Sequence, residues 1–435
     1  MRRLLLDELV KWKEKSSRQP LIVKGVRQCG KTYLLKEFGA KHYADTAYFN
    51  FEGNTSLAER FEGDLDAQRL ITELGVLHKK AIKPAETLII FDEIQFCPKA
   101  LTALKYFCEN APQYHLACAG SLLGIALAKP LSFPVGKVDF LTLRPMSFFE
   151  FLLANGEDML CEYLRALRPF EPVSELFAQK LENHTRNYYI TGGMPEVVAR
   201  WIETKDVGAI EALQQKILDG YEFDFAKYAP AKDFPKLSLI WHSIPRQLAR
   251  ENAKFIFSKV KAGLRSKDLE DALGWLVNAG LAIRAAKIEK PFMPVSAYAD
   301  QDYFKLYMAD VGLLRAMSRL PAEAIIAKTD TYREFKGALT ENYVLCELLN
   351  VYGSDVYYWK SGNMAEVDFI IQAGMDIVPI EVKSERNSRS RSLSEYRKKY
   401  APRVAVKVSM NNVSAGDVVN IPLYMLWNLP AYIQK

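Results

Sequence analysis

The stretch Gly25-Val26-Arg27-Gln28-Cys29-Gly30-Lys31-Thr32 is a complete match to the phosphate-binding pattern G-x-x-x-x-G-K-[ST]. Residues 20–24 before it have the pattern of a strand, and residues 33–38 after it have that of a helix. The glycines permit a tight turn whose backbone amides point at phosphate oxygens. In such a loop Lys31 reaches the β- and γ-phosphates, and Thr32 holds Mg²⁺. The stretch therefore predicts an α/β core that binds ATP and Mg²⁺.

A second motif follows the apolar run at residues 88–91, which ends in Asp92 and Glu93. Asp92 can hold the Mg²⁺ ion through water, and Glu93 can polarise the attacking water as a general base. An acidic pair after an apolar run is weak alone, because strands often end in Asp. Downstream of a complete phosphate-binding loop, it predicts ATP hydrolysis.

Two further residues have open assignments. Ser121 follows the predicted strand His115–Ala119, so it either lies near the γ-phosphate or caps the next helix. Arg144 either senses phosphate charge, in its own chain or across a subunit interface, or is a surface arginine before Pro145. The second alternative is favoured for Arg144.

Composition places the chain among globular proteins, with 435 residues, 49% hydrophobic and 25% charged. At roughly 100–200 residues per domain, two to four domains are expected. Apolar runs stay well short of the roughly 20 residues of a transmembrane helix. Asp7 and Glu8 break the first apolar run, which favours an amphipathic helix over a signal peptide. We therefore expect a cytoplasmic protein without a membrane partner.

Four regions can be separated along the chain. Residues 1–155 alternate short strands with helical stretches, which is typical of a parallel-sheet ATPase core. Residues 156–235 are expected to form a helical lid. Residues 236–300 contain a regular helix that Ser266 can cap, followed by a strand; a winged helix and a plain packing helix are equally consistent. Residues 301–435 return to a mixed α/β pattern.

The motifs together resemble a family of bacterial and archaeal ATPases. Its members have an N-terminal AAA-like P-loop domain and a C-terminal domain related to PD-(D/E)XK nucleases. The matching segments are residues 24–35, 89–95, 119–124, 143–151, 189–196, 336–342 and 366–370. The resemblance implies that Lys31, Thr32, Asp92 and Glu93 form the ATP site and that the C-terminal region is nuclease-like. The biological role of this family is poorly defined.

Three residues near the C-terminus fit metal-dependent phosphodiester cleavage. Asp368 lies in one predicted strand, and Glu381 and Lys383 lie on one face of the next. Two carboxylates can hold Mg²⁺ while the lysine positions a hydroxide, and Glu341 from the preceding helix can add a third carboxylate. The alternative is a charged rim on an edge hairpin. The resemblance favours the nuclease-like fold, but such folds are often kept for binding alone.

The segment from residue 383 to residue 403 holds eight Lys or Arg and two Glu, which equals the net charge of +6 of the whole chain. Such a segment predicts salt-sensitive binding to a polyanion such as DNA, and a solvated charged face is the alternative. Tyr396 and Tyr400 can stack on bases or pack in a helix core. The cations after Lys383 singled out here are Arg389, Arg391, Arg397, Lys398, Lys399 and Arg403.

Three classes of function are consistent with these features. The first is an ATPase acting on DNA, the second is a nucleotide-controlled switch for a protein partner, and the third is a scaffold stabilised by ATP. Asp92 and Glu93 disfavour the scaffold, because it needs no catalytic glutamate. The basic segment favours DNA over a protein partner, which the sequence does not identify. An oligomer is compatible with the sequence, but a ring is not implied, because no arginine finger is evident.

Overall fold

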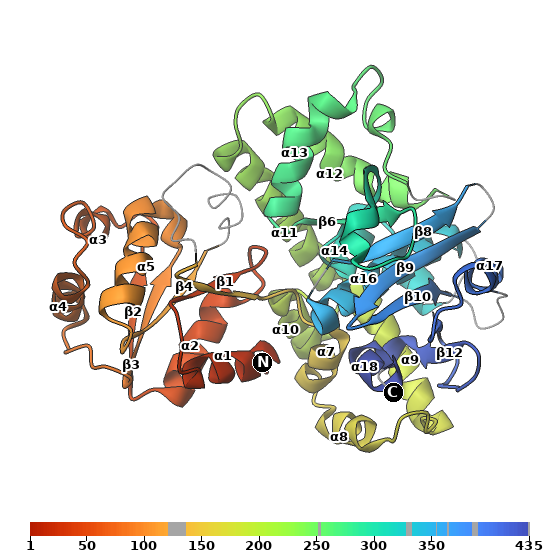
Figure 1. Ribbon diagram of the computed structural model, residues 1–435, viewed down its shortest axis with the longest axis horizontal. Coiled ribbons are helices and arrows are strands. Elements are labelled where there is room, and N and C mark those ends of the chain that lie inside the picture. Colours follow the sequence, from red (N-terminus) through yellow and green to blue (C-terminus); the bar gives the residue numbers. More distant parts are fainter. Residues whose placement is uncertain are drawn as a thin grey trace. The chain divides into compact units, whose positions relative to one another are not determined.

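The computed structural model describes residues 1–120, 136–250, 254–327, 333–353, 355–362, 365–384 and 390–433. Its contacts divide the chain into two compact units. The N-terminal unit is Met1–Arg144 with Asn278–Gly280, and the C-terminal unit is Pro145–Val277 with Leu281–Lys435. In Figure 1 the first unit is mostly red to orange, and the second runs from yellow to blue.

The N-terminal unit is built on a parallel sheet with the order β2-β3-β4-β1-β5 among its described residues. The strands are β1 (Leu21–Lys24), β2 (Asp45–Asn50), β3 (Thr87–Asp92), β4 (His115–Ala119) and β5 (Asp139–Thr142). The helices are α1 (Leu5–Glu14), α2 (Lys31–His42), α3 (Thr55–Glu59), α4 (Ala67–His78) and α5 (Pro98–Asn110), with a 3₁₀ turn at Ile94–Phe96. The predicted α/β core is confirmed.

Strand alternation explains why both faces of this sheet are covered. Ile22 and Ile89 face a core that includes α4 and α5, whereas Leu21 and Leu88 face a second core that includes α1 and α2. A strand buried on both faces reads as a continuous apolar run, which is what the sequence shows. The carboxyl ends of the parallel strands then meet at one edge, where such sheets bind ligands.

The C-terminal unit begins with a helical region. Its helices are α7 (Phe148–Ala154), α8 (Asp158–Ala166), α9 (Glu175–Thr191), α10 (Pro195–Thr204), α11 (Val207–Tyr228), α12 (Phe234–Leu248) and α13 (Ser266–Asn278), whose last residue is grouped with the N-terminal unit. Among described residues, no helix combines the length and apolar character needed to cross a bilayer.

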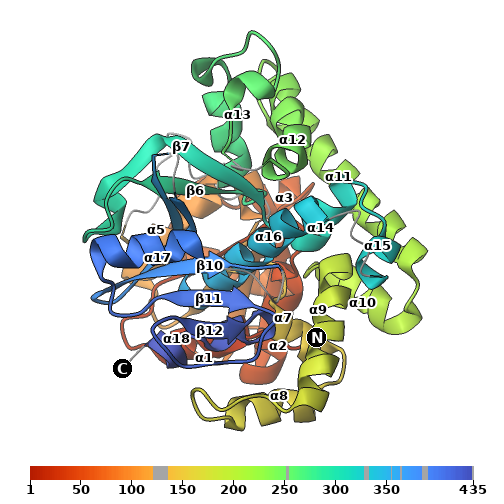
Figure 2. The same cartoon turned by 90° about the vertical axis from the view of Figure 1, so that its right-hand side faces the viewer.

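A mixed sheet completes this unit, with the order β12-β11-β10-β9-β8-β6-β7 over the described residues. The strands are β6 (Ala282–Ile288), β7 (Ala299–Met308), β8 (Tyr357–Ser361), β9 (Ala365–Ala373), β10 (Asp376–Val382), β11 (Val406–Ser409) and β12 (Val419–Pro422). The remaining helices are α14 (Val311–Met317), α15 (Ala322–Ile326), α16 (Arg333–Tyr352), α17 (Arg391–Tyr400) and α18 (Leu429–Ile433), and 3₁₀ turns span Phe257–Lys259, Val295–Tyr298 and Leu423–Asn428. Figure 2 shows β10, β11 and β12 with α17 nearby.

The region predicted as a winged helix is joined to this sheet. Helix α13 begins at Ser266 and buries Leu269 and Leu273, as its periodicity predicts. Strands β6 and β7 pair in antiparallel fashion, but β6 also pairs with β8, and β7 crosses the expected boundary at residue 300. A hairpin alone is marginally stable, and the third strand supplies further partners. The winged helix and the four-region division stay predictions.

The double glycine at residues 192–193 is a packing feature of this unit. The Asp310 carboxylate accepts hydrogen bonds from the Gly193 amide at 2.6 Å and the Leu313 amide at 2.9 Å. A Cβ atom on Gly193 would lie 2.1 Å from the Met146 carbonyl oxygen. The motif therefore lets the end of α9 dock closely against its neighbours. Burial raises the pKa of Asp310 to about 6, although these backbone hydrogen bonds oppose the rise.

Candidate functional site

The phosphate-binding loop lies between β1 and α2, as predicted. Gly25 has φ +150° and Gly30 has φ +94°, conformations that other residues rarely adopt. A Cβ atom on Gly25 would also lie 2.1 Å from the Leu143 carbonyl oxygen at the end of β5. Backbone geometry and the contact with β5 therefore both require glycine here.

Lys31 is buried within this loop, with 6% of the residue exposed. Its Nζ donates to the carbonyl oxygens of Gly25 and Val26, each at 2.8 Å. Both partners are neutral, so a phosphate group offers this ammonium a stronger, charge-assisted hydrogen bond. The geometry therefore suits an exchange of carbonyl partners for phosphate oxygens.

Asp92 ends β3 beside the loop and is 4% exposed. Its Oδ2 accepts hydrogen bonds from Thr32 Oγ1 and from the Tyr48 hydroxyl, each at 2.8 Å. A carboxylate and a hydroxyl are the oxygen ligands that Mg²⁺ uses, so the two predicted residues fit this ion. Burial, with the hydrogen bond to Asp92, raises the pKa of Tyr48 above its usual value. Sequence reasoning missed Tyr48.

Glu93 follows directly and has a left-handed backbone with φ +48°. Positive φ is uncommon outside glycine and often marks a functional position. The Glu93 backbone amide donates to Asp92 Oδ1 at 3.0 Å, and the Gln95 side-chain Nε2 donates to Glu93 Oε2. Asp92 and Glu93 therefore lie at the carboxyl end of β3, and the general-base role of Glu93 stays a prediction.

Arg3 is a further residue at this site that the sequence did not reveal. Its Nη1 donates to the Cys29 carbonyl at 2.8 Å, and its Nη2 donates to the Arg144 carbonyl at 2.6 Å. The buried guanidinium therefore ties the loop to the end of β5. The Arg144 assignment stays a prediction, and Ser121 lies outside the described residues.

The C-terminal residues lie in a separate, partly buried cluster of charges. Asp368 on β9 accepts a hydrogen bond from the Val382 amide at 2.7 Å, and Glu381 pairs with Lys383 at 2.6 Å. Glu381 is only 3% exposed, so its face of β10 is covered, which is not the rim of an edge hairpin. Burial, together with the charge of Glu341, raises the pKa of Asp368 well above its usual value.

Lys305 on β7 joins this cluster, and sequence reasoning missed it. Its Nζ lies 2.7 Å from Glu366 Oε1 and 3.4 Å from Glu341 Oε2. Burial would lower the pKa of Lys305, but Glu341 and the other nearby acidic groups outweigh it and raise the pKa well above its usual value. In the part of the chain that the structure describes, no three His, Cys, Asp or Glu side chains form a group that could hold a metal ion. The cleavage assignment stays a prediction.

Much of the basic segment after Lys383 is paired within the chain. Arg403 pairs with Asp376 at 2.5 Å, and Arg397 pairs with Asp417 at 3.2 Å. Tyr396 is 1% exposed, and its ring lies 5.1 Å from that of Trp359, centroid to centroid. Core packing therefore accounts for Tyr396. Exposed cations remain on α17, and Arg389 lies outside the described residues. The exposed ones are Arg391, Lys398 and Lys399.

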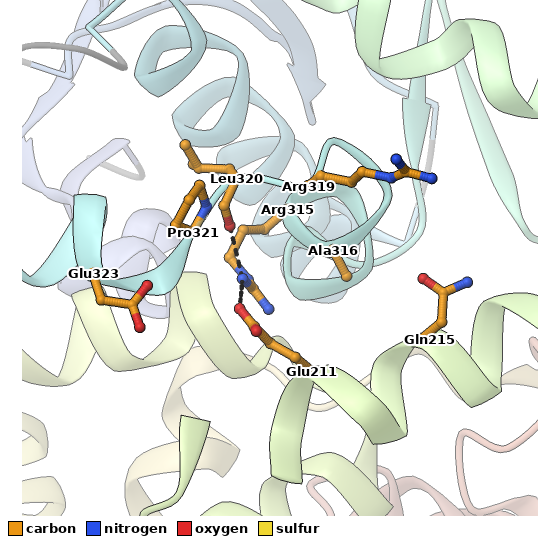
Figure 3. A pocket seen from close by; sticks show the side chains of 8 residues that line it. All are labelled: Glu211, Gln215, Arg315, Ala316, Arg319, Leu320, Pro321 and Glu323. Atoms are coloured by element: carbon orange, nitrogen blue, oxygen red, sulfur yellow. Dashed lines mark hydrogen bonds and ion pairs between the residues drawn. The ribbon is translucent and has the colours of Figure 1, made fainter. Parts of the chain in front are cut away.

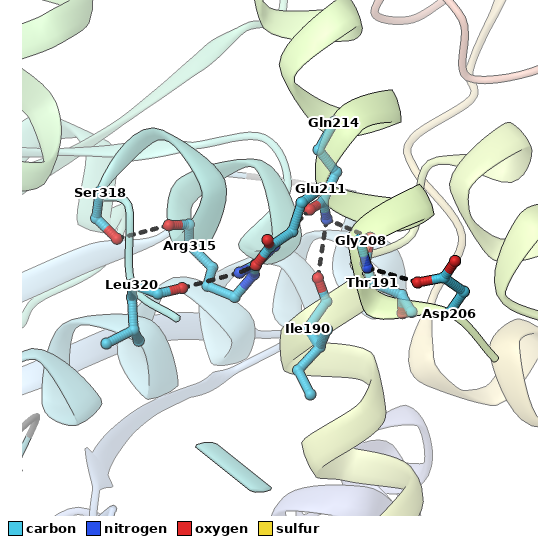
Figure 4. Close-up of polar contacts among 9 residues, drawn as sticks. All are labelled: Ile190, Thr191, Asp206, Gly208, Glu211, Gln214, Arg315, Ser318 and Leu320. Carbon is cyan, nitrogen blue, oxygen red and sulfur yellow. Dashed lines mark hydrogen bonds and ion pairs between the residues drawn. The ribbon is translucent and has the colours of Figure 1, made fainter. Parts of the chain in front are cut away.

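A hollow of about 370 Å³ lies among α11, α14 and α15 (Figure 3). It is lined by Glu211, Gln215, Arg315, Ala316, Arg319, Leu320, Pro321 and Glu323. The Arg315 guanidinium donates to Glu211 at 2.8 Å and to Gln214 at 2.6 Å, and Gln214 donates to the Ile190 carbonyl at 2.8 Å (Figure 4). Arg315 therefore links α14 to α11 directly and to the end of α9 through Gln214. These hydrogen bonds offset the cost of burying its guanidinium group.

Comparison with protein-family models matches residues 17–152 to an AAA domain. The N-terminal unit is therefore an AAA-type P-loop domain, a class that generally binds ATP and Mg²⁺. Beyond it, residues 182–324 match a domain of unknown function, DUF8612, and residues 336–426 match another, DUF4143. A search of curated proteins returned no match.

Solved structures with some similarity include PCH-2 from C. elegans, with 10% identity and a TM-score of 0.29 over 47% of this chain and 62% of that one. A STAND ATPase with a tetratricopeptide repeat sensor, from Pyrococcus horikoshii, has 13% identity and a TM-score of 0.29 over 80% of this chain and 45% of that one. The ORC1 protein of Aeropyrum pernix, solved with DNA, has 13% identity and a TM-score of 0.29 over 74% of this chain and 92% of that one. This chain spans less than two thirds of the length of PCH-2 and of the STAND ATPase.

Proposed function

We propose that the chain is a cytoplasmic, Mg²⁺-dependent ATPase. The observation that carries this proposal is the 2.8 Å contact between Thr32 and Asp92 beside the phosphate-binding loop. These two residues would hold Mg²⁺, which when bound supplies positive charge that offsets the charge of the phosphate oxygens. Lys31 binds and orients the phosphates. Glu93 accepts a proton from the attacking water.

The test separates ATP binding from ATP turnover. Glu93→Gln keeps the shape of the side chain but removes the base, so turnover should fall by about 10²- to 10⁴-fold while ATP affinity is kept. Phosphate release and fluorescent-nucleotide titration measure the two quantities. Glu86→Gln, an exposed site before β3, is the matched control and should behave as the wild type. Wild-type turnover by Glu93→Gln would remove Glu93 from the mechanism.

We further propose that the nucleotide controls the C-terminal unit as a switch. The supporting observation lies in residues 143–146, which join the two units. The Leu143 carbonyl accepts from Cys29 Sγ in the phosphate-binding loop at 3.4 Å. Three residues later, the Met146 amide donates to the Gly193 carbonyl at 2.7 Å. These two hydrogen bonds support coupling of the loop to the C-terminal unit through residues 143–146.

Hydrogen exchange tests this switch. ATP should change the exchange of residues 189–196 in the wild type, and inserting two glycines after Arg144 should remove that change while ATP turnover persists. The same insertion after the exposed Gly63 is the control. An absence of any ATP effect on residues 189–196 in the wild type contradicts the switch.

Action on DNA is a second candidate for what the switch controls. It is favoured by the three exposed cations of α17, Arg391, Lys398 and Lys399. Such cations would give affinity without sequence preference. A protein partner is the alternative, and DNA binding by the wild type distinguishes the two.

A further inference from the structure

The side chain of Lys305 contacts two of the four carboxylates in the C-terminal cluster. It rises from β7, is 2% exposed, and contacts Glu366 at 2.7 Å and Glu341 at 3.4 Å. Glu341 comes from α16 and Glu366 from β9, so one ammonium group joins three elements of the unit. A buried ammonium group needs polar or charged partners, and for Lys305 these partners are carboxylates.

Several carboxylate oxygen atoms of the cluster already have partners. Glu341 Oε2 also accepts from the Tyr307 hydroxyl at 2.8 Å. Glu366 Oε2 lies 3.0 Å from Lys360, and Glu381 Oε1 lies 2.6 Å from Lys383. Glu381 Oε2 is the buried oxygen in this cluster that lacks a partner among described atoms.

The charges of the cluster are also nearly balanced. The cluster holds four carboxyl groups, those of Glu341, Glu366, Asp368 and Glu381. Three lysines accompany them: Lys305, Lys360 and Lys383. A divalent ion among them would add two positive charges beside an ammonium group that cannot leave the interior. The repulsion between like charges at this separation opposes metal binding.

We infer that the ammonium group of Lys305 takes the place of a metal ion, so that Asp368, Glu381 and Lys383 do not form a metal-dependent phosphodiesterase site. Glu341 and Glu366 are joined by an internal cation that the chain itself supplies. This inference does not depend on ATP turnover.

Metal titration by calorimetry tests the inference in nucleotide-free protein that carries Lys31→Ala, which disables the ATP site. With Mn²⁺ or Mg²⁺, this chain should show no heat that depends on Asp368. Adding Lys305→Met, which keeps the length of the side chain but removes its charge, should create one ion site. Asp368→Asn should remove that new site. Lys360→Met is the matched control, because Lys360 contacts the same Glu366 but is 23% exposed.

Two outcomes overturn the inference. One is an ion bound by the chain with Lys305 intact and released on Asp368→Asn. The other is a folded Lys305→Met chain that binds no ion, because the lysine would then not be what excludes the metal.

A second measurement applies if Lys305→Met does not fold. In the Lys31→Ala chain, Mn²⁺ should leave the unfolding temperature unchanged, both with Asp368 and with Asp368→Asn. An increase in the unfolding temperature with Mn²⁺ that Asp368→Asn abolishes overturns the inference. Neither result depends on whether Glu93 serves as the base for ATP hydrolysis.

Discussion

Lys31 and Lys305 are both buried lysines, but their surroundings differ. Lys31 donates to two neutral carbonyl oxygens in the phosphate-binding loop. Lys305 pairs with the carboxylates of Glu341 and Glu366. A lysine held by neutral groups keeps its charge available for an anion. A lysine held by carboxylates is already their counter-ion, so the same side chain forms a binding site in one unit and a fixed support in the other.

The carboxylates follow the same contrast. Asp92 accepts hydrogen bonds from the hydroxyls of Thr32 and Tyr48. These hydroxyls carry no charge, so they leave the charge of Asp92 available to a cation. Glu381 and Glu366 are paired with lysines. The charge state of the partners, and not the number of carboxylates, therefore distinguishes a cofactor site from a structural cluster.

The largest difference is expected in folding stability. Lys305→Ala leaves the partly buried carboxylates of Glu341 and Glu366 without their cation and should lower the free energy of unfolding by about 2–3 kcal/mol. Lys31→Ala removes hydrogen bonds to neutral carbonyls and should cost about 1 kcal/mol. Urea unfolding of both variants measures the difference. Equal losses would contradict the contrast between the two lysines.

Glu347 on α16 shows a third arrangement, a buried carboxyl group that accepts from the Phe148 amide at 2.9 Å. Burial raises its pKa to about 8. The folded chain therefore keeps a proton that the unfolded chain releases, so this group should make stability fall as pH rises from about 5 to about 8. The slope should be about 1 kcal/mol per pH unit. Unfolding curves of the wild type and Glu347→Gln measure it, and a difference that does not grow with pH argues against the raised pKa.

ATP affinity should separate the two lysines in the opposite sense. Lys31→Ala removes a charged hydrogen bond to phosphate and should weaken ATP binding roughly 10- to 100-fold. Any folded Lys305 variant should bind ATP as the wild type does. Lys41→Ala, an exposed position on α2, is the control. Titration with a fluorescent ATP analogue gives all three affinities, and unchanged binding by Lys31→Ala would exclude Lys31 from the site.

The smallest effect concerns DNA. Changing Arg391 and Lys399 on α17 to Gln should flatten the salt dependence of duplex binding by about 0.9 for each phosphate that the variant no longer neutralises. Arg403→Gln is the control, because Arg403 pairs with Asp376. A slope that is unchanged in the α17 variant but altered in the control would place the DNA-binding surface outside α17.

The sequence predicted the ATP site well because its signals are local. The glycines, Lys31 and Thr32 are contiguous, and Asp92 ends an apolar strand. Tyr48 and Arg3 were missed because each reaches the site from a distant segment. Only the fold brings such residues together.

The C-terminal cluster was less predictable for the same reason. Asp368, Glu381 and Lys383 were identified, but Lys305 lies more than sixty positions before Asp368. A signal was present, since Lys305 interrupts an otherwise apolar half of β7. The sequence also did not show that part of the positive charge in the basic segment is paired. Arg397 and Arg403 pair with aspartates that lie outside the segment.

Counting bound Mn²⁺ by electron paramagnetic resonance, with and without a non-hydrolysable ATP analogue, tests the contrast between the two regions most directly. We expect one ion per chain with the analogue, abolished by Asp92→Asn and kept on Asp368→Asn, and none without the analogue. An ion that binds without nucleotide and disappears on Asp368→Asn would contradict this expectation.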